Sequence, residues 1–105
     1  MKKSLLMLCV AILSVSVLWA QEKKPYSVVF YNLENLFDIY NDPETHDDEF
    51  TPEGVKQWNE IKYQKKLSNM ERVLFDIAAI NKEYPVVIGV SEIENRTVLE
   101  DLISQ

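Results

Sequence analysis

Two apolar segments of this sequence are each followed by oxygen-bearing side chains. After "VVFY" at residues 28 to 31 come Asn32, Glu34 and Asn35, and after "VVIGV" at residues 86 to 90 come Ser91, Glu92 and Glu94. An amide carbonyl and a carboxylate, with water completing the shell, form a hard-oxygen site suited to Mg²⁺ or Mn²⁺, whereas Zn²⁺ prefers nitrogen or sulfur. Asn32 and Glu92 are therefore candidate metal ligands. The same residue types also serve as helix caps and turn residues, and composition alone leaves both interpretations open.

The elements that must position these side chains follow from hydrophobic patterning. The apolar runs at residues 28 to 31 and 86 to 90 predict strands at residues 27 to 31 and 86 to 90 that are covered on both faces. Between them, residues 60 to 81 predict one amphipathic helix. Its apolar stripe comprises Tyr63, Leu67, Met70, Val73, Leu74, Ile77 and Ile80, and its water-facing residues are expected to be Lys62, Lys65, Lys66, Glu71 and Arg72. Pro85 ends the helical region, and Asn95 is expected to cap a last helix beginning near Arg96.

The predicted order of strand, helix, strand and helix favours an α/β fold with a mixed or parallel sheet covered by helices. In sheets covered by helices, ligands bind beyond the carboxyl ends of the strands, where side chains leave the core and converge. Asn32 and Glu92 are therefore expected to face one pocket.

The stretches "VVFYNLENLFD" and "VVIGVSEIEN" resemble the first two motifs of the endonuclease/exonuclease/phosphatase superfamily. The linking stretch, "DDEFTPEG...W...YQKKLSNMERVL", resembles secreted bacterial members, so the resemblance covers residues 26 to 105. It implies a four-layer α/β-β/α sandwich, of which this chain would form the N-terminal part. It also implies hydrolysis of phosphodiester or phosphomonoester bonds with Mg²⁺ or Mn²⁺ as cofactor.

The resemblance implies roles for matched residues. Asn32 matches an asparagine at the metal and phosphate site, and Glu92 matches the glutamate that binds the divalent ion directly. Glu94 and Asn95 lie just beyond it and would support these ligands from behind. The implied partner is a phosphate ester, either a nucleic acid or a small or lipid phosphate.

The sequence departs from the family after its second motif. The histidine paired with an acid, the Gly-Asp-x-Asn segment and the terminal Ser-Asp-His are missing, and His46 is expected to be a solvated loop residue. We therefore expect residues 21 to 105 to be an incomplete N-terminal portion of the domain, inactive alone, within a full-length hydrolase. The alternative is a non-catalytic remnant or binding module of the same fold.

The first residues resemble a bacterial secretory signal ending at Ala20. Lys2 and Lys3 precede an apolar stretch, residues 5 to 18, that is too short for an ordinary membrane span. Export to the periplasm or the extracellular space is expected, with no stable membrane partner after cleavage. An uncleaved anchor, with Trp19 at the membrane interface, is the alternative.

The charge of the chain bears on its substrate. The net charge is −6, and removal of residues 1 to 20 leaves 9 basic and 17 acidic residues, a net charge of −8. Tight duplex binding relies on lysine and arginine to neutralise phosphates. The charge therefore favours small or lipid phosphates over long DNA.

Overall fold

A computed structural model describes residues 24–105, so the predicted signal at residues 1 to 20 lies outside the described residues. The elements are β1 (Val28–Leu36), η1 (Asp48–Phe50), α2 (Glu60–Asn81), β2 (Val87–Ile93) and α3 (Arg96–Ile103). The predicted α/β order of strand, helix, strand and helix is confirmed. Within residues 24–105, no helix has the length and apolarity needed to cross a membrane.

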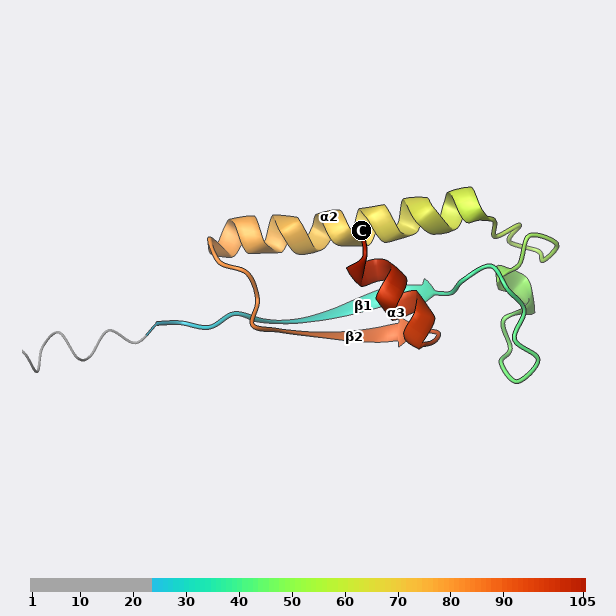
Figure 1. Ribbon diagram of the computed structural model, residues 1–105, viewed down its shortest axis with the longest axis horizontal. Helices are drawn as coiled ribbons and strands as arrows, with labels where there is room; N and C mark the ends of the chain where they lie inside the picture. Colours follow the sequence, from blue (N-terminus) through green and yellow to red (C-terminus); the bar gives the residue numbers. More distant parts are fainter. Residues whose placement is uncertain (1–23) are drawn as a thin grey trace, which may run out of the picture.

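The two strands are paired in parallel, and α2 runs back alongside them (Figure 1). The register joins Val28 to Val87 and continues to the pair Asn32 and Ser91. Both strands extend further than their apolar runs, so Asn32, Glu34 and Asn35 lie within the last part of β1, and Ser91 and Glu92 lie within the last part of β2, whereas Glu94 follows it. The polar residues are thus placed by sheet pairing as well as by the loops that follow.

The helix α2 begins and ends where its sequence predicts. Asn59 is its N-cap, and the Asn59 side chain accepts a hydrogen bond of 3.1 Å from the Lys62 N–H. At the other end, Lys82 adopts the left-handed conformation, with φ 55°, and its N–H donates to helix carbonyls. These caps satisfy backbone groups that an uncapped helix end leaves free. Ile80 departs from the predicted stripe and is exposed.

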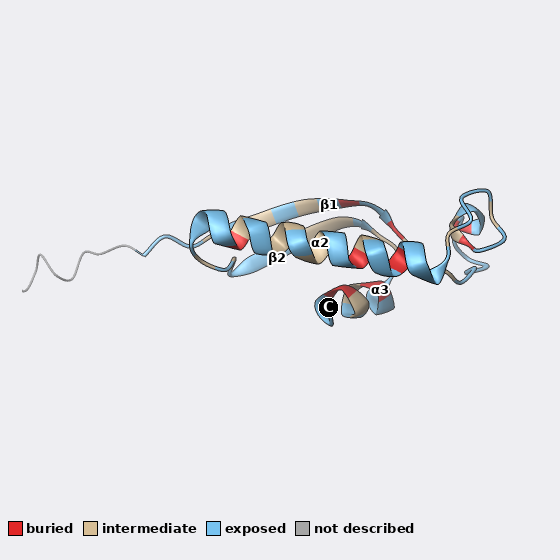
Figure 2. Cartoon of the chain, turned by 90° about the horizontal axis from the view of Figure 1, so that it is seen from above, coloured by how far each residue is buried: buried red, intermediate tan, exposed pale blue. Residues whose placement is uncertain are grey.

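The core lies near the carboxyl ends of the strands, where α3 packs against α2 (Figure 2). It consists of Leu33 and Leu36 from β1, Tyr63 and Leu67 from α2, and Val98 and Leu102 from α3. Burial of these side chains holds three elements together by removing apolar surface from water. The best-packed part of the described chain therefore underlies the polar strand ends.

One face of the strand pair is open. Val28 and Phe30 are 69% and 75% exposed, and their neighbour Val87 is 56% exposed, whereas Tyr31 and Val90 pack against the core. The prediction that both strands are covered on both faces is therefore wrong for residues 24–105. Tyr31 and Val90 alternate with the exposed residues along their strands, so one face of the pair packs against the core and the other stays exposed.

Candidate functional site

A bulge interrupts the strand pairing where the polar residues begin. Beyond the pair of Asn32 and Ser91, the register resumes only at Leu36 and Ile93, so β1 has three residues opposite one of β2. Glu34, Asn35 and Glu92 all have positive φ, at 52°, 59° and 56°. This left-handed region is uncommon for residues other than glycine, and such strain often accompanies functional sites.

The bulge brings Asn32 and Glu92 together. Asn32 Nδ2 donates a hydrogen bond of 2.9 Å to Glu92 Oε1, and both side chains are exposed. Asn32 is paired with Ser91, so regular alternation would place the Glu92 side chain on the opposite face of the sheet. Bulges redirect side chains in this way. The structure therefore brings together the two residues predicted to share a pocket.

The Asn32 amide is oriented by a backbone group. Its Oδ1 accepts a hydrogen bond of 2.8 Å from the Glu34 N–H. Because a backbone N–H can only donate, this contact selects the amide oxygen and turns Nδ2 toward Glu92. Asn32 Nδ2 thus holds the Glu92 carboxylate in place. Asn32 Oδ1 already accepts a hydrogen bond from the backbone of the bulge.

Glu94 points to a different group of residues. Its Oε2 accepts a hydrogen bond of 2.9 Å from the Asp38 N–H, which ties the segment after β2 to the segment after β1. Burial raises the pKa of the Glu94 carboxyl, as do the nearby carboxylates of Asp38 and Asp47, while the Asp38 N–H opposes this rise. Asp47 is buried, and its Oδ2 accepts from the Asp42 N–H at 2.9 Å. This acidic group organises the loop before η1.

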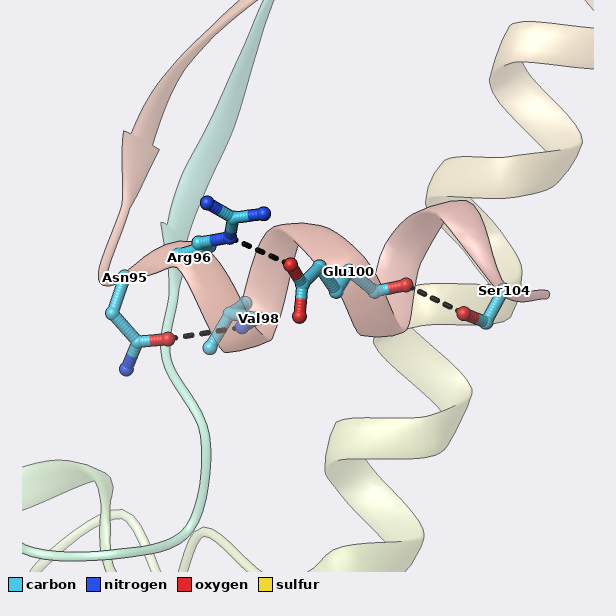
Figure 3. A network of polar contacts seen from close by, with 5 residues as sticks. All are labelled: Asn95, Arg96, Val98, Glu100 and Ser104. Carbon is cyan, nitrogen blue, oxygen red and sulfur yellow. Dashed lines mark hydrogen bonds and ion pairs between the residues drawn. The ribbon is translucent and has the colours of Figure 1, made fainter.

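Asn95 caps α3, as predicted. Its Oδ1 accepts a hydrogen bond of 2.9 Å from the Val98 N–H (Figure 3), and its Nδ2 donates to Asp38 Oδ2 at 3.3 Å. Arg96 Nε contacts Glu100 Oε1 at 2.7 Å on the same helix. Glu94 and Asn95 therefore converge on Asp38, which was not among the predicted site residues. Asp38 Oδ1 accepts a hydrogen bond from the Tyr40 N–H, as aspartate commonly does in turns. An aspartate directly after an apolar run was the signal in the sequence.

Lys66 was predicted to face water, and its side chain is only partly exposed. Its Nζ donates to the backbone carbonyls of Glu34 at 2.6 Å and Asn35 at 3.1 Å, and the side chain is half-buried. The position immediately before Leu67 lies at the edge of the apolar stripe, and this was the signal in the sequence. The structure therefore places a cation beside the bulge.

The donor groups fit one part of a magnesium site. Mg²⁺ is commonly bound through one or two carboxylates, with water and substrate phosphates as further ligands. Glu92 supplies one carboxylate at the strand end. Among the described residues, no three histidine, cysteine, aspartate or glutamate side chains form a group suited to hold a metal ion. His46 is exposed in the loop before η1, as expected.

Comparison with known proteins places this arrangement in a family. A sequence profile described as the Endonuclease/Exonuclease/phosphatase family matches residues 27–105. Neither a curated protein nor a solved structure matches the chain. The family generally hydrolyses phosphate esters and typically depends on divalent metal ions, and the order of elements agrees with the N-terminal part of its sandwich fold. Because the match spans more than half of the sequence and includes both polar strand ends, the chain belongs to the endonuclease/exonuclease/phosphatase family.

Proposed function

We propose that this protein takes part in metal-dependent hydrolysis of phosphate esters, with Glu92 as a ligand of Mg²⁺ or Mn²⁺ and Asn32 as the residue that orients it. The observation that carries the proposal is the 2.9 Å hydrogen bond between Asn32 and Glu92 at the carboxyl end of a parallel strand pair. This edge is where ligands bind in sheets of this kind. The left-handed backbone at Glu92 adds support, because such strain is tolerated where function requires it.

Each residue has a distinct part in the proposed chemistry. Glu92 binds the cation, and the Asn32 amide restricts the carboxylate to one orientation. A divalent ion, when bound, polarises a phosphoryl oxygen and stabilises the leaving oxygen of the ester. Glu94 and Asn95 hold the neighbouring loop through Asp38, so they act on the shape of the site and not on the substrate.

The substrate is a phosphodiester or phosphomonoester. The net charge of −6 favours a small or lipid phosphate over long DNA, because a polyanion is repelled by an acidic surface. Parallel assays with an inositol phosphate, a phospholipid headgroup ester and duplex DNA test this preference. Faster turnover of duplex DNA at physiological salt would contradict it.

The decisive experiment compares Glu92→Ala with Glu53→Ala in the full-length protein. Glu53 is an exposed glutamate in the loop after η1, so its variant removes the same charge away from the strand ends. Glu92→Ala should lower Mg²⁺-dependent hydrolysis by at least about 100-fold with an unchanged circular dichroism spectrum. Wild-type activity in Glu92→Ala would refute the assignment of Glu92.

A second candidate function is a binding module of the same fold. It would need only the Glu92 carboxylate at the strand end, which the Asn32 amide holds at 2.9 Å, and no group that activates water. A general base is needed close to the attacking water. Mn²⁺ binding without hydrolysis of any phosphate ester by the full-length protein would support the module over the enzyme.

Export is also part of this proposal. The basic and apolar pattern of residues 1 to 20 supports a cleaved secretory signal and a periplasmic or extracellular location. Sequencing the N-terminus of the protein recovered from cells that produce it tests the proposal. The expected first residue is Gln21, and recovery of an intact Met1 from the membrane fraction would indicate the uncleaved anchor.

A further inference from the structure

The side chain of Lys66 spans the space between α2 and the distorted end of β1. Its Nζ lies 2.6 Å from the Glu34 carbonyl oxygen and 3.1 Å from the Asn35 carbonyl oxygen. The same Nζ lies 5.7 Å from the centre of the Trp58 ring. Trp58 is itself held by a hydrogen bond of 3.0 Å from Nε1 to the Phe37 carbonyl. Lys66 Nζ therefore has two backbone acceptors from β1 and one aromatic neighbour.

The two carbonyls that Lys66 contacts belong to the bulge. Glu34 and Asn35 are consecutive left-handed residues, and they lie in the interval where β1 and β2 lose their regular pairing. Carbonyl groups that leave a ladder need another donor. A lysine ammonium can satisfy two of them at once, because it carries three donors. Lys66 thus supplies hydrogen bonds to the segment that β2 does not pair.

The bulge in turn orients the candidate ligand. The Glu34 N–H donates to Asn32 Oδ1 at 2.8 Å, and Asn32 Nδ2 donates to Glu92 Oε1 at 2.9 Å. Lys66 binds the carbonyl of the same Glu34 residue whose N–H selects the Asn32 orientation. A continuous set of hydrogen bonds therefore runs from α2 through the backbone of Glu34 to the Glu92 carboxylate.

We propose that Lys66 is a positioning residue for the metal site, which acts on Glu92 through the Glu34 backbone and the Asn32 amide. This inference rests on the proposed function, because it assumes that Glu92 binds the cation. Residues that orient metal ligands typically change metal affinity 10- to 100-fold when they are removed. Lys66 would act from a neighbouring helix without touching the metal or the substrate.

The positive charge of Lys66 could act on metal affinity in the opposite direction, by repelling the metal cation. Burial lowers the pKa of Lys66, while the nearby carboxylates of Glu34 and Glu92 raise it. If the Lys66 cation also repels a second cation at Glu92, its removal would tighten metal binding. Water and salt screen this repulsion at the exposed Glu92 side chain, so we expect the positioning effect to be larger.

The test titrates Mn²⁺ alone into the full-length protein and follows binding by electron paramagnetic resonance. Lys66→Met removes the positive charge and the hydrogen-bond donors but keeps an unbranched side chain. Lys66→Arg keeps the charge and the donors. Lys65→Met is the matched control on the exposed side of α2. Lys66→Met should weaken Mn²⁺ binding about tenfold. Lys66→Arg should restore most of the affinity, and Lys65→Met should match the wild type. Unfolding in urea is measured for each variant.

The Asn32 side-chain amide provides a second readout that is independent of metal. Its ¹⁵N and proton resonances should move in Lys66→Met and stay in place in Lys65→Met, because only the first change frees the Glu34 backbone. If Lys66→Met does not fold, Lys66→Gln, which keeps a neutral donor, takes its place with the same expected direction. Unmoved Asn32 resonances in a folded variant would overturn the inference.

The outcomes separate this inference from the proposed function. If the wild type binds no Mn²⁺, or if Glu92→Gln binds it as tightly as the wild type, the proposed function fails. If Glu92→Gln loses binding but Lys66→Met binds as tightly as the wild type or more tightly, the proposed function stands and the role of Lys66 is refuted.

Discussion

The side-chain amide of Asn32 donates to the Glu92 carboxylate at 2.9 Å, which joins residues sixty positions apart at the ends of two parallel strands. The contact depends on a bulge, because Asn32 is in register with Ser91 and regular alternation would turn Glu92 away. Three left-handed residues, Glu34, Asn35 and Glu92, accompany it. The geometry of the candidate site is therefore a property of the distorted end of the sheet.

Backbone strain at Glu92 predicts that a glycine variant is more stable than an alanine variant at this position. Glu92 has φ 56°, where alanine is disfavoured by about 1 kcal/mol relative to glycine. Glu92→Gly should therefore be more stable than Glu92→Ala by about 1 kcal/mol in urea unfolding. Both variants should lack metal-dependent hydrolysis, because both lack the carboxylate. An alanine variant at least as stable as the glycine variant would show that the left-handed conformation is absent in solution.

The neutral amide of Asn32 is the hydrogen-bond partner of the Glu92 carboxylate, and a negative charge at this position would repel it. Asn32→Asp keeps an acceptor for the Glu34 N–H but places a second carboxylate at hydrogen-bond distance from Glu92. We expect a loss of roughly 1 kcal/mol in the free energy of unfolding at pH 7, reduced by exposure to solvent. Protonation removes the repulsion between neighbouring carboxylates in general, so the loss should be smaller at pH 3.5 than at pH 7.

The control for this prediction is Asn69→Asp, which adds the same charge on the exposed side of α2. Urea unfolding of both variants at pH 7 and pH 3.5 provides the comparison. Equal losses for Asn32→Asp and Asn69→Asp at both pH values would show that the Asn32 amide has no special relation to Glu92.

Tyr63 predicts a dependence of stability on alkaline pH. Its hydroxyl is buried and donates to Asp101 Oδ2 at 2.7 Å, and burial, followed by the Asp101 contact, raises the pKa of Tyr63. An unfolded tyrosine has a pKa near 10, so above about pH 10 the folded state retains a proton that the unfolded state loses. The stability due to this group is therefore complete below pH 10 and falls as the pH rises.

Tyr63→Phe removes both the hydrogen bond and this titration. At pH 8 we expect the variant to be less stable than the wild type by about 1 kcal/mol. The difference should narrow between pH 10 and pH 11.5, because only the wild type loses stability from Tyr63 in that range. Chemical unfolding at pH 8, 10 and 11.5 measures it, and a constant or widening difference would contradict the assigned contact.

The cap of α3 yields a prediction that separates structure from activity. Asn95→Ala removes the 2.9 Å contact with the Val98 N–H and should cost about 1 kcal/mol of stability. Asn95→Ser, which restores a capping oxygen, should recover most of this loss. The metal dependence of hydrolysis should be the same in both variants. A change in the metal concentration required by Asn95→Ala that serine does not correct would place Asn95 in the metal site.

Much of the architecture follows from local patterns in the sequence. The alternating spacing of Tyr63, Leu67 and the residues beyond predicts α2 with its observed bounds, because one face of a helix must bury a continuous apolar stripe. Asn95 marks the start of α3 through its capping oxygen. The order of strands and helices then leads to parallel pairing, since a helical crossover returns the chain in the same direction.

The sequence by itself determined the order of the two strands and two main helices, the bounds of α2, the family and the two residues expected at the strand ends, because periodicity and capping are local properties of the chain. Only the tertiary structure decided how those residues meet. Regular strand pairing is lost at the bulge, where Glu34 and Asn35 are left-handed. There Glu92 contacts Asn32, and Lys66 donates to the Glu34 carbonyl. Such unpaired groups arise only when two distant segments are brought into register, and the pattern of side chains along one segment does not record them.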